Sequence, residues 1–188
     1  MIEIPRSFAK AEIRRFFRKI RTLRDRVLFD LIYRHGLRRS EAAQLRVDDI
    51  DLKEMTITIR RLKGSRSGVY RLHPESVRLL RAYLRQCRTD NPYLFPGRLP
   101  DTHICAQTIY HACRKYARAA KASRANPHAF RHACGITLLD SGLDLVDVAD
   151  HLGHRSLATA MRYAAVSNKR RNDNFERIVK SHEFARTV

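Results

Sequence analysis

The sequence lacks the features that mark membrane, secreted or disulfide-bonded proteins. It contains no apolar run of about 18 residues, no signal peptide and no lipidation motif. Its 4 cysteines show no C-x-x-C spacing, and Cys113 and Cys134 fall on predicted apolar helix faces, where we expect buried thiols. These absences favour a soluble, cytoplasmic protein.

Acidic residues are also few. The chain has 19 Asp and Glu against 38 Lys and Arg, which gives a formal net charge of +19. A charge of this size predicts a polyanionic partner. An anionic membrane surface would attract it too, but the chain carries none of the membrane signals named above.

The histidines do not have the pattern of a metal site. His128 and His132 are four residues apart, and His151 and His154 are three apart, both of which zinc can use. However, the first pair lacks the Glu of the metalloprotease helix motif, and no acidic residue is placed as a third ligand. We expect neither a metal nor another cofactor.

Hydrophobic periodicity predicts an α+β fold that is predominantly α-helical, with a small antiparallel β-hairpin or sheet. Residues 55–60 alternate apolar and polar, and a basic, Gly-containing turn leads to a second strand at residues 69–72. Ser7 and Ser40 are expected to cap two of the helices. The predicted helices span roughly residues 8–20, 24–34, 74–87, 106–121, 127–142, 145–152 and 156–164, with a further short helix after Ser40.

The candidate functional residues gather between residues 127 and 166. His128 and Arg131 are three apart on one helix, so their side chains can converge on a small anion that also needs proton transfer. His154 lies in the turn after Gly153, and Tyr163 lies off the apolar stripe of the next helix. On the residues alone, a solvated basic face and a half-buried tyrosine remain open as alternatives.

Arg38 is a second, separate candidate. It lies in the turn just ahead of a predicted helix N-terminus, which is a favourable location for an anion. Taken alone, its position favours a surface cation over a phosphate ligand.

Two independently spaced sets of motifs resemble one family. Pro-His-Ala-Phe-Arg-His at 127–132, His-Leu-Gly-His-Arg-Ser at 151–156 and the segment 159–163 are similar to the catalytic core of the tyrosine recombinases, or phage-type integrases. The segment 36–41, Gly-Leu-Arg-Arg-Ser-Glu, resembles the first arginine motif of the same family. The resemblance covers residues 8–163.

The resemblance implies a role for each of the matching residues. Arg38 and Arg131 would bind the scissile phosphate, and Tyr163 would attack phosphorus to form a covalent 3′-phosphotyrosine. His128 would help to take the tyrosine proton, and His154 would hydrogen-bond the phosphate.

Two further residues are implied by the same resemblance. Lys63 is the best match to the catalytic lysine that the family carries on a hairpin, where it would protonate the leaving 5′ oxygen. The sequence after Lys63 lacks the family's Lys-x-Arg-x-Val-Pro pattern, so Arg66 remains a rival. Glu41 would be the supporting carboxylate.

The implied function is that of a site-specific DNA recombinase of the integrase, invertase or resolvase type. It would act on double-stranded DNA as a homotetramer. We expect a single catalytic domain over residues 1–167, without a separate N-terminal DNA-clamp domain, and a tail over residues 168–188 that could dock on a neighbouring subunit. A non-catalytic DNA-binding regulator and a type IB topoisomerase are the alternatives.

Overall fold

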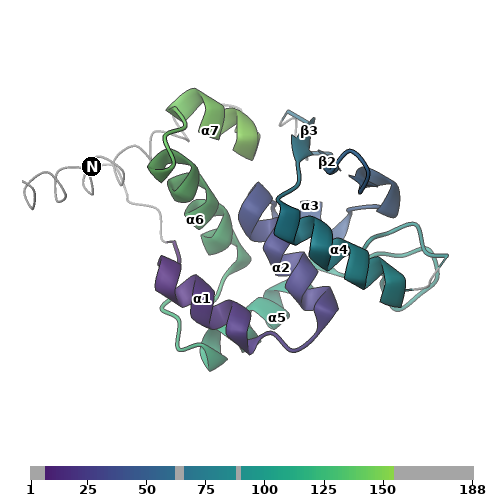
Figure 1. Ribbon diagram of the computed structural model, residues 1–188. Coiled ribbons are helices and arrows are strands. Elements are labelled where there is room, and N and C mark those ends of the chain that lie inside the picture. Colours follow the sequence, from purple (N-terminus) through teal and green to yellow (C-terminus); the bar gives the residue numbers. More distant parts are fainter. Residues whose placement is uncertain (1–6, 62–65, 88–89, 155–188) are drawn as a thin grey trace, which may run out of the picture.

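The computed structural model describes residues 7–61, 66–87 and 90–154. In this part the chain is rich in helices and has one small antiparallel sheet, which confirms the predicted α+β class (Figure 1). None of the described helices is long and apolar enough to cross a membrane. The α-helices are α1 (Lys10–Lys19), α2 (Leu23–His35), α3 (Arg39–Ala43), α4 (Pro74–Gln86), α5 (Ala106–Ala119), α6 (Pro127–Asp140) and α7 (Leu145–Leu152).

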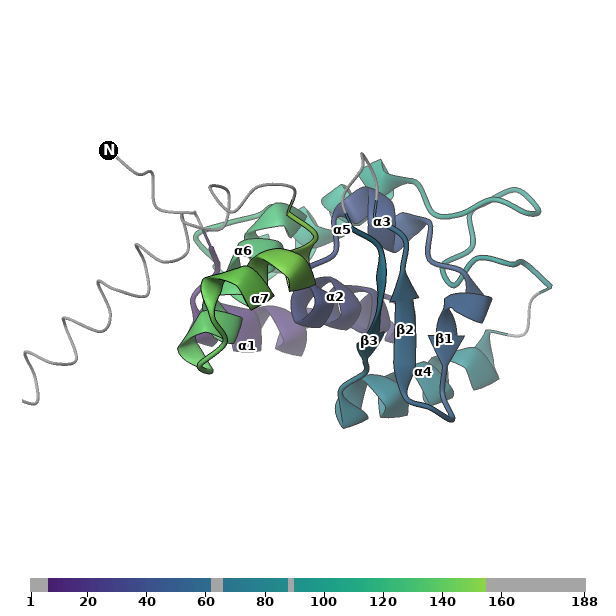
Figure 2. The same cartoon turned by 90° about the horizontal axis from the view of Figure 1, so that it is seen from above.

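Helix α2 lies at the centre of the fold. It packs against both α4 and α6. Figure 2 shows it between the sheet on one side and α6 and α7 on the other. Its apolar side chains Val27, Leu28, Leu31 and Ile32 are all buried. Helix α2 therefore contacts both the part of the fold that holds the sheet and α4 and the part that holds α6 and α7. Its C-terminal end lies between these two parts.

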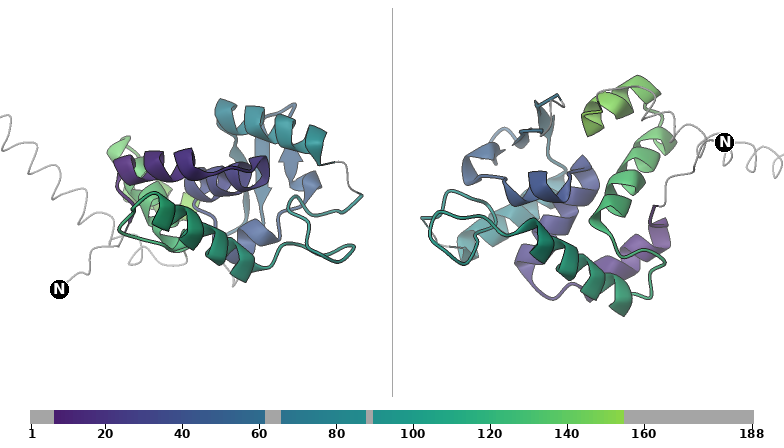
Figure 3. Two further views of the ribbon diagram at one scale, coloured as in Figure 1. Left: turned by 90° about the horizontal axis from the view of Figure 1, so that it is seen from below. Right: turned by 180° about the vertical axis from the view of Figure 1, so that it is seen from behind.

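Aromatic packing joins α1 and α5 to this core. The ring centroid of Phe16 on α1 lies 5.1 Å from that of Phe29 on α2 and 4.8 Å from that of Phe130 on α6. The ring planes cross at 81° and 71°, so the edge of one ring meets the face of the other, which is a favourable arrangement. Helix α5 packs beside α1 on the lower side of the molecule (Figure 3).

The sheet has three antiparallel strands in the order β1 (Ile50–Asp51), β2 (Thr56–Ile59) and β3 (Gly68–Arg71). The predicted β2–β3 hairpin is confirmed, with Ile57 opposite Tyr70. Ile57 and Ile59 are buried and the threonines between them are partly exposed, as the alternation predicts. Strand β1 was not predicted, because two residues are too few to show a period. A 3-10 turn, η1 (Val47–Asp49), leads into β1.

Two predicted helix caps are wrong. Helix α1 begins at Lys10 after Ala9, not at Ser7, and α3 begins at Arg39 after Arg38, not at Ser40. In both helices a glutamate in the first turn accepts a hydrogen bond from the backbone N–H of the residue before the helix, at 2.8 Å. This carboxylate satisfies the helix start without a serine and sets its position.

Helices α2 and α7 both end on glycines in the left-handed region. Gly36 has φ 58° and Gly153 has φ 63°, values that residues with a Cβ rarely adopt. At Gly36 the space is limiting as well, because an added Cβ would lie 2.2 Å from Cδ2 of Leu152 on α7. The backbone at the end of α2 therefore lies directly against the Leu152 side chain at the end of α7, with no room for a Cβ between them.

We predict that Gly36→Ala lowers the free energy of unfolding by about 2–5 kcal/mol, which combines backbone strain with a steric clash. Gly142→Ala is the matched control, because Gly142 also has positive φ (98°) but a Cβ there would meet nothing within 4 Å. Strain alone should cost the control about 1–2 kcal/mol. Urea unfolding of the two variants measures the difference, and equal losses would contradict the close approach of α2 and α7.

Candidate active site

Arg38 and Glu41 form the first part of the site, at the start of α3. The Glu41 carboxylate accepts hydrogen bonds from the backbone N–H of Arg38 at 2.8 Å and from its Nη1 at 2.5 Å. The Arg38 side chain is 32% exposed, whereas that of Glu41 is 1% exposed. A buried carboxylate thus orients a guanidinium that still reaches solvent.

Glu41 has a second partner in Arg61, the second residue after the end of β2. Nη1 of Arg61 donates to Oε2 of Glu41 at 2.9 Å, and both side chains are buried. Burial acts to raise the pKa of the Glu41 carboxyl, but the N–H of Arg38 and the charge of Arg61 outweigh it, so that this pKa lies below its ordinary value. Glu41 is therefore ionised at neutral pH and holds two arginines at once.

The C-terminal ends of α2 and α7 are joined by two arginines. Nη2 of Arg61 binds one carbonyl of each helix end, and the guanidinium of Arg131, on α6, binds the next carbonyl along each. Such terminal carbonyls have no partner within their helix and carry partial negative charge. The acceptors are the carbonyls of His35 (3.2 Å) and His151 (2.6 Å) for Arg61, and those of Gly36 and Leu152 for Arg131.

His128 stands in the first turn of α6, which Asn126 caps by accepting the N–H of His128 at 2.9 Å. Its ring lies at the protein surface, 4.5 Å from the ring of His132 between centroids. Partial loss of hydration, followed by the charges of Arg131 and then Arg38, lowers the pKa of His128. The imidazole is thus favoured as a neutral base.

His154 directly follows Gly153 and so lies beside the junction of α2 and α7. Burial lowers the pKa of His154 to about 3, and the charges of Arg131 and Arg38 contribute in that order after it. The charges of the same two guanidiniums therefore lower the pKa of two histidines from different elements. Arg38, Arg131, His128 and His154 therefore lie near one another, and the positive charge of this group is carried by the two arginines.

Two of the predicted site residues, Lys63 and Tyr163, lie outside the described residues. Arg66, the rival of Lys63, has an 86% exposed side chain and lies 3.5 Å from the carboxylate of Asp150 on α7. The structure therefore groups Arg38, Glu41, His128, Arg131 and His154, and it places Arg66 at the surface.

Comparison with known proteins agrees with the motifs and with this geometry. Residues 6–170 match the phage integrase family. This chain belongs to that family. The predicted family is thereby confirmed.

Relatives of this chain include named recombinases. It is 29% identical to tyrosine recombinase XerA of Pyrococcus furiosus, over 93% of this chain and 62% of XerA. It is 35% identical to the type 1 fimbriae regulatory protein FimE of Escherichia coli, over 76% of this chain and 74% of FimE. This chain thus spans less than two thirds of the length of XerA.

A solved structure shares the fold. XerH bound to a palindromic difH substrate, in a post-cleavage complex, matches with a TM-score of 0.78 at 24% identity, over 92% of this chain and 53% of XerH. This likeness places the helices and the small sheet of the integrase in the arrangement of that recombinase.

Within the described ranges, no three His, Cys, Asp or Glu side chains of the integrase are grouped so that they could hold a metal ion. Positive charge at the site comes from guanidiniums instead. Arg38, Arg61 and Arg131 surround the ends of α2, α3 and α7, and an arginine keeps its charge at any pH at which the protein is folded.

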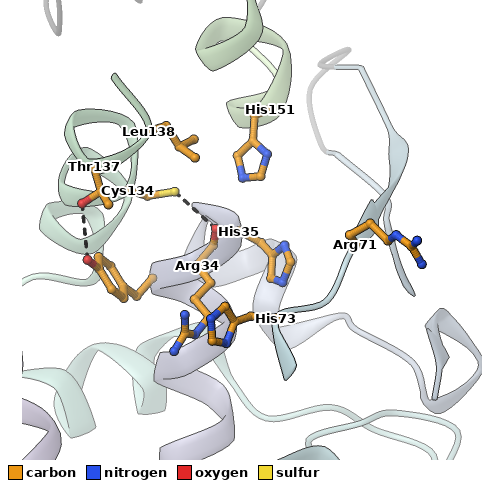
Figure 4. A pocket seen from close by; sticks show the side chains of 9 residues that line it. Arg34, His35, Arg71, His73, Cys134, Thr137, Leu138 and His151 are labelled. Carbon is orange, nitrogen blue, oxygen red and sulfur yellow. Dashed lines mark hydrogen bonds between the residues drawn. The ribbon is translucent and has the colours of Figure 1, made fainter. Parts of the chain in front are cut away.

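A pocket of about 250 Å³ lies beside the same junction (Figure 4). The rings of His35 and His151 face into it, with centroids 6.3 Å apart and planes nearly parallel. Neither ring nitrogen of His35 has a hydrogen-bond partner among the described residues. The other lining residues are Tyr33, Arg34, Arg71, His73, Cys134, Thr137 and Leu138.

Sequence reasoning missed Arg61, although a signal was present. Ile57, Ile59 and Arg61 stand two apart, so the period of β2 directs Arg61 to the buried side with the isoleucines. An arginine at an inward position needs hydrogen-bonding partners and is a candidate for a structural or functional contact.

Stability of this integrase should depend on His35 in mild acid. Burial, then the charges of His151, Arg61 and Arg34, lower the pKa of His35 from 6.5 to about 3. Between these values the unfolded chain binds a proton that the folded protein does not, so stability falls as the pH drops below about 6.5. From pH 7 to pH 5 this proton should cost about 2 kcal/mol.

His35→Phe should remove that share of the loss, since phenylalanine cannot bind the proton. Urea unfolding at pH 5 and pH 7 measures it, with His111→Phe, at an exposed position on α5, as the control. The same difference between pH 7 and pH 5 in the His35 variant and the unaltered protein would refute the assignment.

Proposed function

We propose that this integrase is a site-specific DNA recombinase of the integrase, invertase or resolvase type, which cleaves and rejoins strands through a covalent 3′-phosphotyrosine. The observation that carries the proposal is that three separate parts of the fold bring these side chains together: Arg38 before α3, His128 and Arg131 on α6, and His154 after α7. The charges of both arginines act on both histidines. The name of XerA, tyrosine recombinase, agrees with it.

Double-stranded DNA is the proposed substrate. The net charge of +19 favours a polyanion, and binding would proceed largely by release of counterions from the DNA backbone. XerH, whose fold this chain shares, is seen with a DNA substrate. Phosphate contacts would supply the affinity, whereas contacts to base edges would select the site.

The arginines suit the charge that develops in the reaction. A phosphodiester under attack accumulates negative charge on its non-bridging oxygens, and a planar guanidinium can donate paired hydrogen bonds to them. Arg38, which is held by Glu41 and still reaches solvent, is the clearest such donor. The hydrogen bonds of Arg131 to the carbonyls of Gly36 and Leu152 fix the plane of its guanidinium beside the site. A guanidinium has five N–H donors, so it can bind several acceptors at once.

Tyr163 is the proposed nucleophile. Its phenolic oxygen would bond to phosphorus while the bond from phosphorus to the 5′ oxygen breaks. His128 would help to take the tyrosine proton, Lys63 would give a proton to the 5′ oxygen, and His154 would hydrogen-bond the phosphate. Because the phosphotyrosine keeps the energy of the broken bond, rejoining needs no nucleotide cofactor.

The proposed working form is a tetramer assembled on DNA. Residues 1–167 would form the catalytic domain, and the tail over residues 168–188 would dock on the next subunit. In the sequence of the tail, Phe175, Ile178 and Val179 recur at helical spacing. A helix of about ten residues is marginal alone and needs a surface to pack on.

We predict that Tyr163→Phe abolishes the covalent adduct and leaves DNA affinity within about threefold, since the ring and the cations remain. Incubation with a nicked DNA site, followed by denaturing electrophoresis, measures the adduct. Tyr110→Phe is the matched control, because it removes the same hydroxyl from α5. An adduct formed by the Tyr163 variant would exclude Tyr163 as the nucleophile, and no adduct from the unaltered protein would favour a non-catalytic DNA-binding protein.

We predict that removal of residues 172–188 leaves DNA binding within about threefold, because the basic segment at 169–171 is kept. Recombination between paired sites should fall by more than about tenfold, since subunits could no longer dock. Gel shifts and a two-site recombination assay separate the two effects. Recombination at the full-length rate would contradict docking of the tail on another subunit.

A further inference from the structure

We propose that Arg61 is a positioning residue of the strand-cleavage reaction, which acts through Glu41 to fix the guanidinium of Arg38. The inference rests on the proposed function and adds a residue to its site. It starts from two bonds in series, because Arg61 donates to Oε2 of Glu41 at 2.9 Å and Oε1 of Glu41 accepts from Arg38 at 2.5 Å.

The two oxygens of the Glu41 carboxylate connect these two hydrogen bonds. Glu41 presents one oxygen to the Arg61 guanidinium and the other to that of Arg38, so the plane of the carboxylate is set from both sides. The Arg61 side chain is 0% exposed and that of Glu41 is 1% exposed. With no water to replace a lost partner, a change at Arg61 leaves Glu41 free to rotate and moves the acceptor that aligns Arg38.

Arg61 is itself held from several directions. Its Nη2 donates to the carbonyls of His35 and His151, and its backbone N–H donates to the hydroxyl of Ser67 at 3.0 Å. The guanidinium carbon of Arg61, Cζ, lies 5.8 Å from the centroid of the Tyr70 ring on β3, which adds a cation–π contact. The guanidinium of Arg61 therefore has a fixed position in the fold. Its hydrogen bond to Glu41 fixes the position of that carboxylate in turn.

The test is an Arg61→Lys variant, because lysine keeps the charge and can still bind Glu41. A lysine ammonium is a compact charge without the planar fork, so it cannot hold Glu41 and two carbonyls in one geometry. We expect single-turnover cleavage at saturating DNA to slow by more than about thirtyfold, with the DNA dissociation constant unchanged within about threefold. This split between rate and affinity is the signature of a positioning defect.

Arg60→Lys is the matched control. Arg60 is the neighbouring residue, carries the same charge and also pairs with a buried aspartate, Asp49, but its side chain is 61% exposed. Cleavage by this variant should stay within about threefold of the unaltered protein. Equal rates for the Arg60 and Arg61 variants would overturn the proposal, as would a loss of DNA binding that matches the loss of cleavage.

A double-mutant cycle tests the route through Glu41. If Arg61 acts through this carboxylate, then Arg61→Lys should slow a Glu41→Gln protein by less than about threefold, because the route is already broken. Defects that multiply would show that Arg61 supports the fold independently and would overturn the proposal.

Folding of each variant is checked by its thermal unfolding midpoint. Should Arg61→Lys not fold, a Glu41→Gln protein that also carries Arg61→Met makes the same comparison against Glu41→Gln alone, since both charges of the buried pair are then removed together. The unaltered protein separates the two hypotheses: if it forms no adduct, the proposed function fails and this inference fails with it, whereas an adduct with a fully active Arg61 variant removes only the inference.

Discussion

The C-terminal ends of two helices meet in this molecule, and two buried guanidiniums make the meeting favourable. The ends of α2 and α7 both carry partial negative charge, so that on their own they would repel one another. Arg61 and Arg131 each bind two carbonyls, one from the end of α2 and one from the end of α7. Gly36 and Gly153 allow the backbones to turn away immediately afterwards. Everything proposed for the site depends on this junction.

The junction explains why the site is rigid as well as positive. A buried charge is tolerated only when its hydrogen bonds are supplied by the protein. Arg61 meets most of this condition with Glu41 and two carbonyls, although its Nε has no hydrogen-bond partner among the described residues, and these bonds leave little freedom in any of these groups. Rigid, correctly aimed cations stabilise a transition state without first having to reorganise, so the same hydrogen bonds that burial requires would also serve the proposed reaction.

Local signals in the sequence were sufficient for the α-helices of the described part of the chain and for the β2–β3 hairpin, but not for β1 or for two helix starts. Pro127 starts α6, Gly36 and Gly153 end their helices, and the alternation of Ile57 and Ile59 marks β2. Motif spacing grouped the histidines and arginines that the structure brings together. Arg61 escaped because its role comes from partners 20 to 90 residues away, and no local pattern reports such contacts. The caps failed because a first-turn glutamate outcompeted each serine.

Arg131 and Arg61 also determine when a competent site can exist during synthesis. Their bonds to α7 join residues 21 and 90 positions apart, and the second of these closes a loop that spans nearly half of the chain. A nascent chain that has emerged only as far as α6 already contains Arg38, Glu41 and both junction arginines. It still lacks the helix end that completes the junction. An unfinished polypeptide can therefore carry the arginines of the proposed site before the junction that holds them is complete.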